Sequence, residues 1–183
     1  MAESGGETQW IQGAVAGDKD SFCQLVMIYQ KRAYSLAFRL LKDPGAAEDV
    51  AQEAFCRAWL SISRFVPERP FASWILRIVY RLAINRSRLS ARQAHPTGAL
   101  DGLKSKGPDD PERSAENRDT FHRLECALET MEEGARSMFL LHHMEGMSIR
   151  DIAAIVERPE GTVKTILFRT RKQLRLTLGL DGD

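Results

Sequence analysis

Apolar residues recur at spacings of three and four along most of this chain, and this periodicity constrains its fold more than any other feature. Such spacing gathers apolar side chains on one face of a helix, whereas a half-buried strand needs strict alternation, which no segment convincingly has. Three stripes occur in the first half: Phe22, Leu25, Val26, Tyr29, Ala33, Leu36, Ala37 and Leu40; Val50, Ala51, Ala54, Phe55, Ala58, Trp59 and Ile62; and Trp74, Ile75, Ile78, Val79, Leu82 and Ala83. Asp43-Pro44 predicts the start of the second helix, because Asp caps helices and proline fits a first turn. The first half is therefore predicted to be a compact helical bundle.

The pattern is interrupted from about residue 93 to residue 117. The run HPTGALDGLKSKGPDDPERSAEN has few large apolar residues and three prolines, so it predicts an extended or disordered linker. Helical periodicity resumes at Phe121. We expect an all-α chain of two small helical domains joined by a flexible linker. The predicted boundaries are a disordered N-terminus at 1–9, a first domain at 10–92, the linker at 93–117, a second domain at 118–178 and a tail at 179–183.

Composition excludes several classes of protein. The chain is 43% apolar, which is enough for a packed core, and it contains neither a membrane-length apolar run nor a standard secretion signal. Its three cysteines, Cys23, Cys56 and Cys126, are widely spaced and form no CxxC pair. This argues against a disulfide scaffold or a zinc ribbon and favours reduced thiols in a cytoplasmic protein. We expect Cys23 and Cys126 in the core and Cys56 on the surface, where redox sensing is an open alternative.

The formal net charge of +1 hides an uneven distribution. Residues 64–92 contain seven basic side chains against Glu68 alone, and residues 161–178 contain five and no acid. Acidic residues gather around residues 48–53, 101–119 and 125–133. Two basic patches suit a protein that grips a phosphate backbone in two places, although solvated helix faces explain the charge equally well.

The C-terminal region contains a helix-turn-helix pattern. Ser148-Ile-Arg-Asp151 resembles a helix cap, and Ile149, Ile152, Ala153 and Val156 form the expected buried face of the helix that follows. Pro159 ends that helix, and a second one is predicted from about Gly161-Thr162 to Thr177. Its inner face is Val163, Leu167, Thr170 and Leu174, and its outer face is Lys164, Thr165, Phe168, Arg169, Arg171 and Lys172. The second helix therefore suits a DNA major groove, the alternative being a helical hairpin with a basic face.

Two groups in the first half are candidates for binding. Asp49, Gln52 and Glu53 lie at i, i+3 and i+4, opposite the apolar stripe, where they suit a basic partner helix. A solvated face and a catalytic carboxylate pair are the alternatives, the latter disfavoured because no His, Ser or Cys partner is near in sequence. The loop from Phe65 to Phe71 and the helix after it interleave aromatic residues with arginines, a pattern that suits unstacked bases. Much of Trp74 is expected in the core.

Two blocks of the sequence together resemble a known family. The runs GDKDSFCQLVMIYQKRAYSLAFRLLKDPGAAEDVAQEAFCRAWLSISRF and FASWILRIVYRLAINRSR resemble domain two of bacterial extracytoplasmic-function sigma factors. The run LETMEEGARSMFLLHHMEGMSIRDIAAIVERPEGTVKTILFRTRKQL resembles their domain four. The resemblance covers about residues 10–90 and 118–178.

The resemblance implies a non-enzymatic subunit that binds core RNA polymerase and directs promoter-specific transcription initiation, in a stress or envelope response. The implied partners are the beta-prime clamp helices, the beta flap, promoter DNA and an anti-sigma factor, with no cofactor or metal. Domain two would capture a flipped base in the loop Val66–Ala72 and hold the melted minus-ten strand, while domain four would read the minus-thirty-five element as duplex. The matching positions are Asp49, Gln52 and Glu53 for the polymerase; Phe65, Val66, Glu68, Arg69, Phe71, Trp74, Arg77, Tyr80, Arg81, Asn85 and Arg88 for the minus-ten element; and Thr162, Lys164, Thr165, Phe168, Arg169, Arg171 and Lys172 for the minus-thirty-five element.

The sequence departs from the family pattern at several positions. Arg81 and Asn85 stand where relatives commonly have Asn and Asp, Ile166 stands where many have Arg, and the loop VPERP contains two prolines. The promoter sequence is therefore not carried over from relatives.

Other classes of function remain alternatives. They are a stand-alone helix-turn-helix regulator, which needs no acidic docking helix, and a helical polymerase-interaction protein, which needs no basic recognition helix. An enzyme is disfavoured because no nucleophile–base pair, phosphate loop or metal spacing occurs. His142 and His143 are adjacent on a predicted helix and point in different directions, so we expect packing or solvent exposure and no joint metal site.

Overall fold

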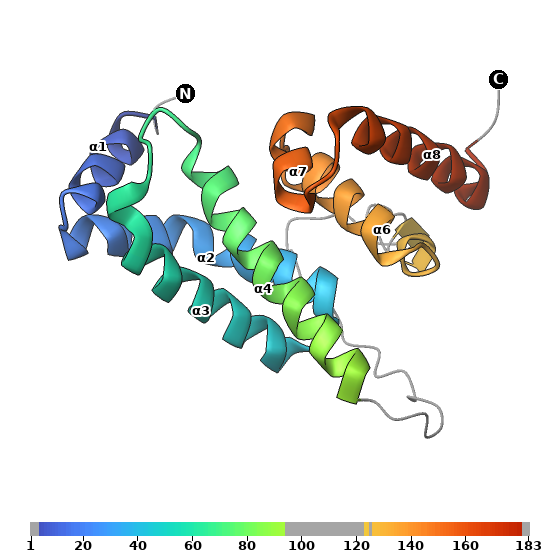
Figure 1. Ribbon diagram of the computed structural model, residues 1–183, viewed down its shortest axis with the longest axis horizontal. Coiled ribbons are helices and arrows are strands. Elements are labelled where there is room, and N and C mark those ends of the chain that lie inside the picture. Colours follow the sequence, from blue (N-terminus) through green and yellow to red (C-terminus); the bar gives the residue numbers. More distant parts are fainter. Residues whose placement is uncertain (1–3, 94–122, 125, 181–183) are drawn as a thin grey trace. The chain divides into compact units, whose positions relative to one another are not determined.

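The computed structural model describes residues 4–93, 123–124 and 126–180, and the predicted linker lies almost entirely outside these ranges. The chain divides into two compact units, residues 1–108 and 109–183 (Figure 1). Every regular element in the described ranges is helical. The predicted all-α fold of two helical domains is therefore confirmed. No helix in these ranges is long and apolar enough to cross a membrane.

The N-terminal unit is built around one long central helix. Its elements are α1 (Ser4–Val15), α2 (Lys19–Leu41), α3 (Pro44–Ser61), the short 3₁₀ helix η1 (Ile62–Arg64) and α4 (Phe71–Gln93). Helix α2 packs against α1, α3 and α4, and α3 also packs against α4 (Figure 1). The three long helices bury their apolar stripes against one another, as the periodicity predicts.

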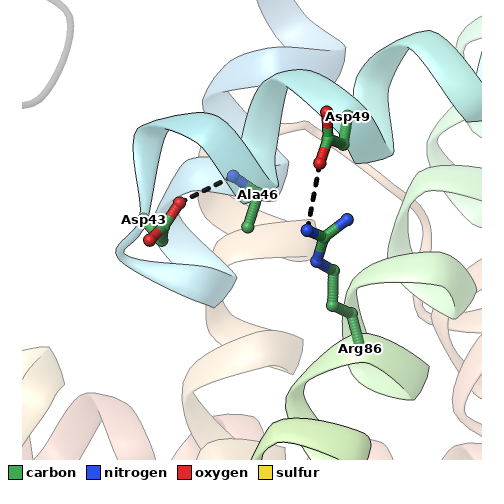
Figure 2. A network of polar contacts seen from close by, with 4 residues as sticks. All are labelled: Asp43, Ala46, Asp49 and Arg86. Carbon is green, nitrogen blue, oxygen red and sulfur yellow. Dashed lines mark hydrogen bonds and ion pairs between the residues drawn. The ribbon is translucent and has the colours of Figure 1, made fainter.

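Aspartate caps fix where the long helices begin. The carboxylate of Asp18 accepts hydrogen bonds from the backbone N–H groups of Asp20 and Ser21 at the start of α2. Asp43 Oδ1 accepts from Ala46 N at 2.6 Å at the start of α3, directly before Pro44 (Figure 2). Capping satisfies backbone donors that have no partner within the helix. The predicted Asp43-Pro44 start is confirmed.

The core differs from the predicted stripes in a few places. Phe38 is buried although the stripe omits it, whereas Val26, Trp59, Trp74 and Ile78 are only half-buried. Trp59 contacts the ring of Phe22, and Trp74 contacts the rings of Phe65 and Phe71, so both tryptophans still pack against core residues. Cys23 and Cys126 were expected in the core, but both are exposed, and Cys56 is exposed as expected. The expectation for Cys23 and Cys126 is therefore wrong.

The N-terminus is the main difference from the sequence prediction. Residues 1–9 were predicted to be disordered, whereas residues 4–9 belong to α1. Ile11 and Ala14 of this helix are buried, and α1 packs against both α2 and η1. The two buried residues are three apart, so they lie on one face of α1 and can pack together against the rest of the unit. The disorder prediction is wrong for residues 4–9.

The C-terminal unit carries the helix-turn-helix. Its elements are α6 (Glu133–Phe139), the π-helical segment η2 (Leu140–Met144), α7 (Ile149–Val156) and α8 (Glu160–Leu178), and residues 123–124 and 126–129 are also helical. Ser148 caps α7 by accepting from Asp151 N at 3.1 Å, as predicted. Glu157 ends α7 in the left-handed region with φ +56°, and Pro159 precedes α8. This short turn sets α8 against α7 and α6.

Candidate functional site

The acidic side chains predicted on the second helix share the exposed face of α3. Asp49, Gln52 and Glu53 are all exposed and lie at spacings that bring side chains together on a helix. Each of them has a polar partner within the chain. The contacts are Arg86 Nη2 to Asp49 Oδ2 at 3.0 Å (Figure 2), Arg57 Nη2 to Glu53 Oε1 at 2.6 Å, and Gln52 Nε2 to Glu48 Oε1 at 3.2 Å.

These contacts are open to water and therefore replaceable. The side chain of Asp49 is 62% exposed and that of Arg86 is 45% exposed. An ion pair in such a position stabilises a protein by about 0.2–1 kcal/mol, because water screens it and both side chains lose freedom. An incoming basic helix can thus compete with Arg86 and Arg57 for the same carboxylates. The pairing of Arg86 with Asp49 was not predicted, and opposite charge was its only signal in the sequence.

The loop between η1 and α4 presents its polar residues to solvent. Val66, Glu68 and Arg69 are exposed, and Arg69 N donates to the carbonyl of Val66 at 3.0 Å, closing a turn. Pro67 occupies the second position of this turn, which suits its fixed backbone angle. The closing hydrogen bond and the proline together define the backbone of the loop before anything binds to it.

The aromatic residues predicted to meet bases lie beneath this loop. Phe65 and Phe71 are 6% and 1% exposed, and the two rings are 5.6 Å apart. Trp74 is half-buried and contacts both, at 5.0 Å from Phe65 and 5.5 Å from Phe71. Tyr80 is also buried, at 9% exposure. Phe65, Phe71 and Tyr80 are thus buried in this conformation, and their contact with bases stays a prediction.

A polar stripe continues from the loop along α4. Arg77, Arg81, Asn85 and Arg88 follow one another at spacings of four, four and three, and the last three are exposed. Arg77 is half-buried, and its Nε is buried without a hydrogen-bond partner among the described residues. A buried donor without an acceptor destabilises a fold, so such a group often has a functional reason.

The outer face of α8 agrees with the predicted pattern. Lys164, Thr165, Phe168, Arg169, Arg171 and Lys172 are exposed, Thr162 is half-buried, and Val163, Leu167, Thr170 and Leu174 are buried. Phe168 is 64% exposed, which is unusual for an aromatic side chain in a small domain. The inner face of α7 differs slightly, since Ile155 is buried while Ile149 and Val156 are half-buried. A basic helix with one exposed ring is thereby held against two supporting helices.

The two histidines occupy the π-helical segment. His142 Nδ1 donates to the carbonyl of Met147 at 2.9 Å, while the exposed His143 ring lies 4.5 Å from the ring of Phe139. Partial desolvation of the ring, followed by His142 and Arg171, holds the pKa of His143 below its ordinary value, because each disfavours the charged imidazole. No group of three or more metal-ligating side chains occurs in the described part of the chain.

The predicted site residues thus lie in three groups. The polymerase set is on α3, the minus-ten set is on the loop and α4, and the minus-thirty-five set is on α8 in the other unit. The third group belongs to a separately folded unit, and the first two share one unit.

Comparisons with known proteins assign both units. The family Sigma-70 region 2 matches residues 25–93, and the family Sigma-70, region 4 matches residues 121–174. The structure of CnrH with the cytosolic domain of CnrY is similar with a TM-score of 0.67, 24% identity, and coverage of 97% of this chain and 99% of that one. The structure of the sigma factor RpoE with the anti-sigma factor NepR from Bartonella quintana has a TM-score of 0.73, 22% identity, and coverage of 88% and 98%. These two likenesses show a shared fold.

Sequence relatives are similar over nearly their whole length. RNA polymerase sigma-H factor from Pseudomonas aeruginosa is 30% identical, covering 92% of this chain and 91% of the relative. ECF RNA polymerase sigma factor SigW from Bacillus subtilis is 34% identical, covering 88% of this chain and 91% of the relative. The chain therefore belongs to the extracytoplasmic-function sigma factors, the non-enzymatic subunits that bind core RNA polymerase and direct promoter-specific transcription initiation.

Proposed function

We propose that this sigma factor docks on core polymerase through Asp49, Gln52 and Glu53 of α3. The observation that carries the proposal is that all three are exposed on one helix face and hold only replaceable partners. The cationic partner expected on the polymerase is a clamp helix of the beta-prime subunit. Opposite charge steers such an encounter, and exchange of Arg57 and Arg86 for polymerase residues keeps every carboxylate paired.

The loop and the polar stripe of α4 are assigned to the melted minus-ten strand. Val66, Glu68 and Arg69 form the exposed edge of the loop, where a flipped base has polar atoms to meet. Base extrusion costs a few kcal/mol, which pocket and phosphate contacts offset. Arg77, Arg81 and Arg88 are arranged to follow the phosphates of a single strand. Phe65, Phe71, Trp74 and Tyr80 support this surface from below.

Helix α8 is assigned to the minus-thirty-five element. Its outer face carries the positive charge that binds a duplex backbone, on Lys164, Arg169, Arg171 and Lys172. An arginine can also donate two hydrogen bonds to the edge of a guanine. Thr165 and Phe168 add a hydroxyl and an apolar surface on the same face. The helix is thus equipped both to position itself on phosphates and to distinguish bases.

We further infer a cytoplasmic location and regulation by an anti-sigma factor. Transcription initiation takes place where the polymerase and the chromosome are, which places the protein in the cytoplasm. The solved RpoE structure of the same fold contains the anti-sigma factor NepR, which supports a similar partner for this chain. A stress or envelope signal would then act by releasing the sigma factor.

The test is run-off transcription from a random promoter library with bacterial core polymerase and the full chain. Dependence on the protein and enrichment of two spaced elements are expected. Glu53→Lys should lower core association and transcription together, because it replaces an acidic docking group with a repelling one. Asp20→Lys is the matched control, since Asp20 is exposed on α2 in the same unit and the charge change is identical.

Two results would contradict these assignments. Core association that is equal for Glu53→Lys, Asp20→Lys and the unchanged protein would remove α3 as the docking surface. Sequence-specific duplex binding without any core association would instead favour a stand-alone regulator.

A further inference from the structure

The loop between η1 and α4, which we propose reads the minus-ten strand, packs on a connected set of aromatic rings. Phe65 ends η1 at the start of the loop, and Phe71 begins α4 at its end. The two rings contact each other and Trp74, with all three centroid separations between 5.0 and 5.6 Å. Both ends of the loop are therefore fixed by one cluster, and a displacement of this cluster changes the loop geometry.

Tyr29 of α2 connects this cluster to the N-terminal helix. Its ring lies 5.3 Å from that of Phe71, and its hydroxyl donates to Glu7 Oε1 of α1 at 2.5 Å. Tyr29 is 5% exposed, and its hydrogen bond to Glu7 is part-buried. Burial and the Glu7 carboxylate raise the pKa of Tyr29, which keeps the phenol protonated and donating.

Helix α1 is connected to both ends of the loop and packs closely against α2. It packs against η1, which leads directly into Phe65, and it reaches Phe71 through Glu7 and Tyr29. Its end fits closely onto α2, because a Cβ on Gly13 would lie 2.9 Å from the Cβ of Ser21. The backbone carbonyl of Gly13 also accepts from Asp18 N at 2.9 Å.

We propose that α1 positions the minus-ten reading loop, with Glu7 and Tyr29 as positioning residues that set its base selectivity. Neither residue touches DNA in this proposal. The hydrogen bond fixes the Tyr29 ring, the ring fixes Phe71, and Phe71 fixes the end of the loop. The inference rests on the proposed role of residues 66–69 in reading the minus-ten strand. It gives a function to α1, of which residues 4–9 were predicted to be disordered.

The test compares Tyr29→Phe with Tyr34→Phe in the full chain bound to core polymerase. Tyr29→Phe keeps the ring and removes only the donor to Glu7. Tyr34 lies on the same helix, half-buried, with its ring 6.1 Å from Phe38, and it provides a matched control. Transcripts from the random promoter library report base preference at each position, so the minus-thirty-five element is an internal control.

Tyr29→Phe should lower discrimination between bases at the minus-ten positions by about 2- to 10-fold, which is the range expected for the loss of one hydrogen bond. Preferences at the minus-thirty-five element and core association should match those of Tyr34→Phe, whereas the midpoint of thermal unfolding should be a few degrees lower, because the part-buried Glu7 carboxylate loses its donor. Glu7→Ala should reproduce the loss, and Glu7→Gln should largely restore selectivity because its amide oxygen still accepts.

Three outcomes distinguish the possibilities. Unchanged minus-ten preferences in both Tyr29→Phe and Glu7→Ala overturn the positioning role. An equal loss at both promoter elements also overturns it, since that indicates a general loss of structure. A wild-type library without any minus-ten preference contradicts the proposed function of the loop and, with it, the positioning role.

Discussion

The carboxylate of Asp49 accepts a hydrogen bond from Arg86 Nη2 at 3.0 Å, and this ion pair joins α3 to α4 across 37 positions of the sequence (Figure 2). Asp49 belongs to the proposed polymerase-docking face, and Arg86 belongs to the basic helix beside the proposed strand-binding stripe. If the polymerase binds Asp49, Arg86 loses its partner, and its positive charge is then free on α4, the helix that we propose binds DNA. The two surfaces of the N-terminal unit are therefore in electrostatic contact.

A double-mutant cycle of Asp49→Asn and Arg86→Gln measures this contact. We expect a coupling of about 0.2–1 kcal/mol in the free energy of urea unfolding, because both side chains are exposed. The coupling should shrink as salt is raised, since solvent-exposed charges are screened. A coupling above about 2 kcal/mol would contradict this, because it exceeds what a hydrated pair supplies.

Arg77 is expected to contribute to single-strand binding without contributing to the stability of the fold. Its Nε is buried without a partner among the described residues, so Arg77→Met should leave the free energy of unfolding unchanged or raise it by about 1 kcal/mol. The same substitution should weaken holoenzyme binding to a single-stranded minus-ten oligonucleotide. Loss of one phosphate contact should also reduce the slope of log affinity against log salt by about 0.7.

Arg136 in the other unit provides a matched control for Arg77. Its Nε is likewise buried without a partner in the part of the chain that the structure describes. Arg136→Met should have a similar effect on stability and none on single-strand binding. Equal binding by Arg77→Met and Arg136→Met would remove Arg77 from the strand-binding surface.

Periodicity predicted the long helices well because their burial is local and repetitive. The inner face of α8, for example, consists of the four predicted residues Val163, Leu167, Thr170 and Leu174. The Asp43 and Ser148 caps were also predicted, since a cap depends on residues within one turn. These features require only neighbours in sequence, which a single chain supplies.

Tertiary contacts explain what the sequence did not predict. Helix α1 is short, so its stability depends on packing against α2 and η1 and not on its own residues. The loop aromatics Phe65 and Phe71 have the composition of a base-stacking surface, and only their mutual packing shows that they are buried. The same applies to Asp49, whose exposure was predictable while its pairing with Arg86 was not.

Phe168 should contribute to duplex recognition without contributing to stability. Because the ring is 64% exposed, Phe168→Ala should change the free energy of unfolding by only about 0.5 kcal/mol. Its loss should weaken holoenzyme binding to the minus-thirty-five duplex with no change in salt slope, since an apolar ring contacts a thymine methyl and no phosphate. Lys164→Ala should instead reduce the duplex slope by about 0.9.

Leu176→Ala is the control for Phe168→Ala, because Leu176 is 61% exposed on the same helix outside the predicted recognition surface. Equal loss of duplex affinity in the two variants would assign the effect to general helix hydrophobicity. A reduced salt slope for Phe168→Ala would place the ring against a phosphate-binding side chain and not against a base.

His143 should make the C-terminal unit less stable in mild acid. Its pKa is lowered in the folded state, chiefly by burial and also by the facing groups His142 and Arg171. The unfolded chain, with a pKa of about 6.5, therefore binds a proton more readily than the folded one, and stability falls as pH drops below this value. His143→Gln should flatten the dependence of the unfolding midpoint on pH between about 5 and 7. Parallel pH profiles for the variant and the unchanged protein would show that His143 is not the group responsible.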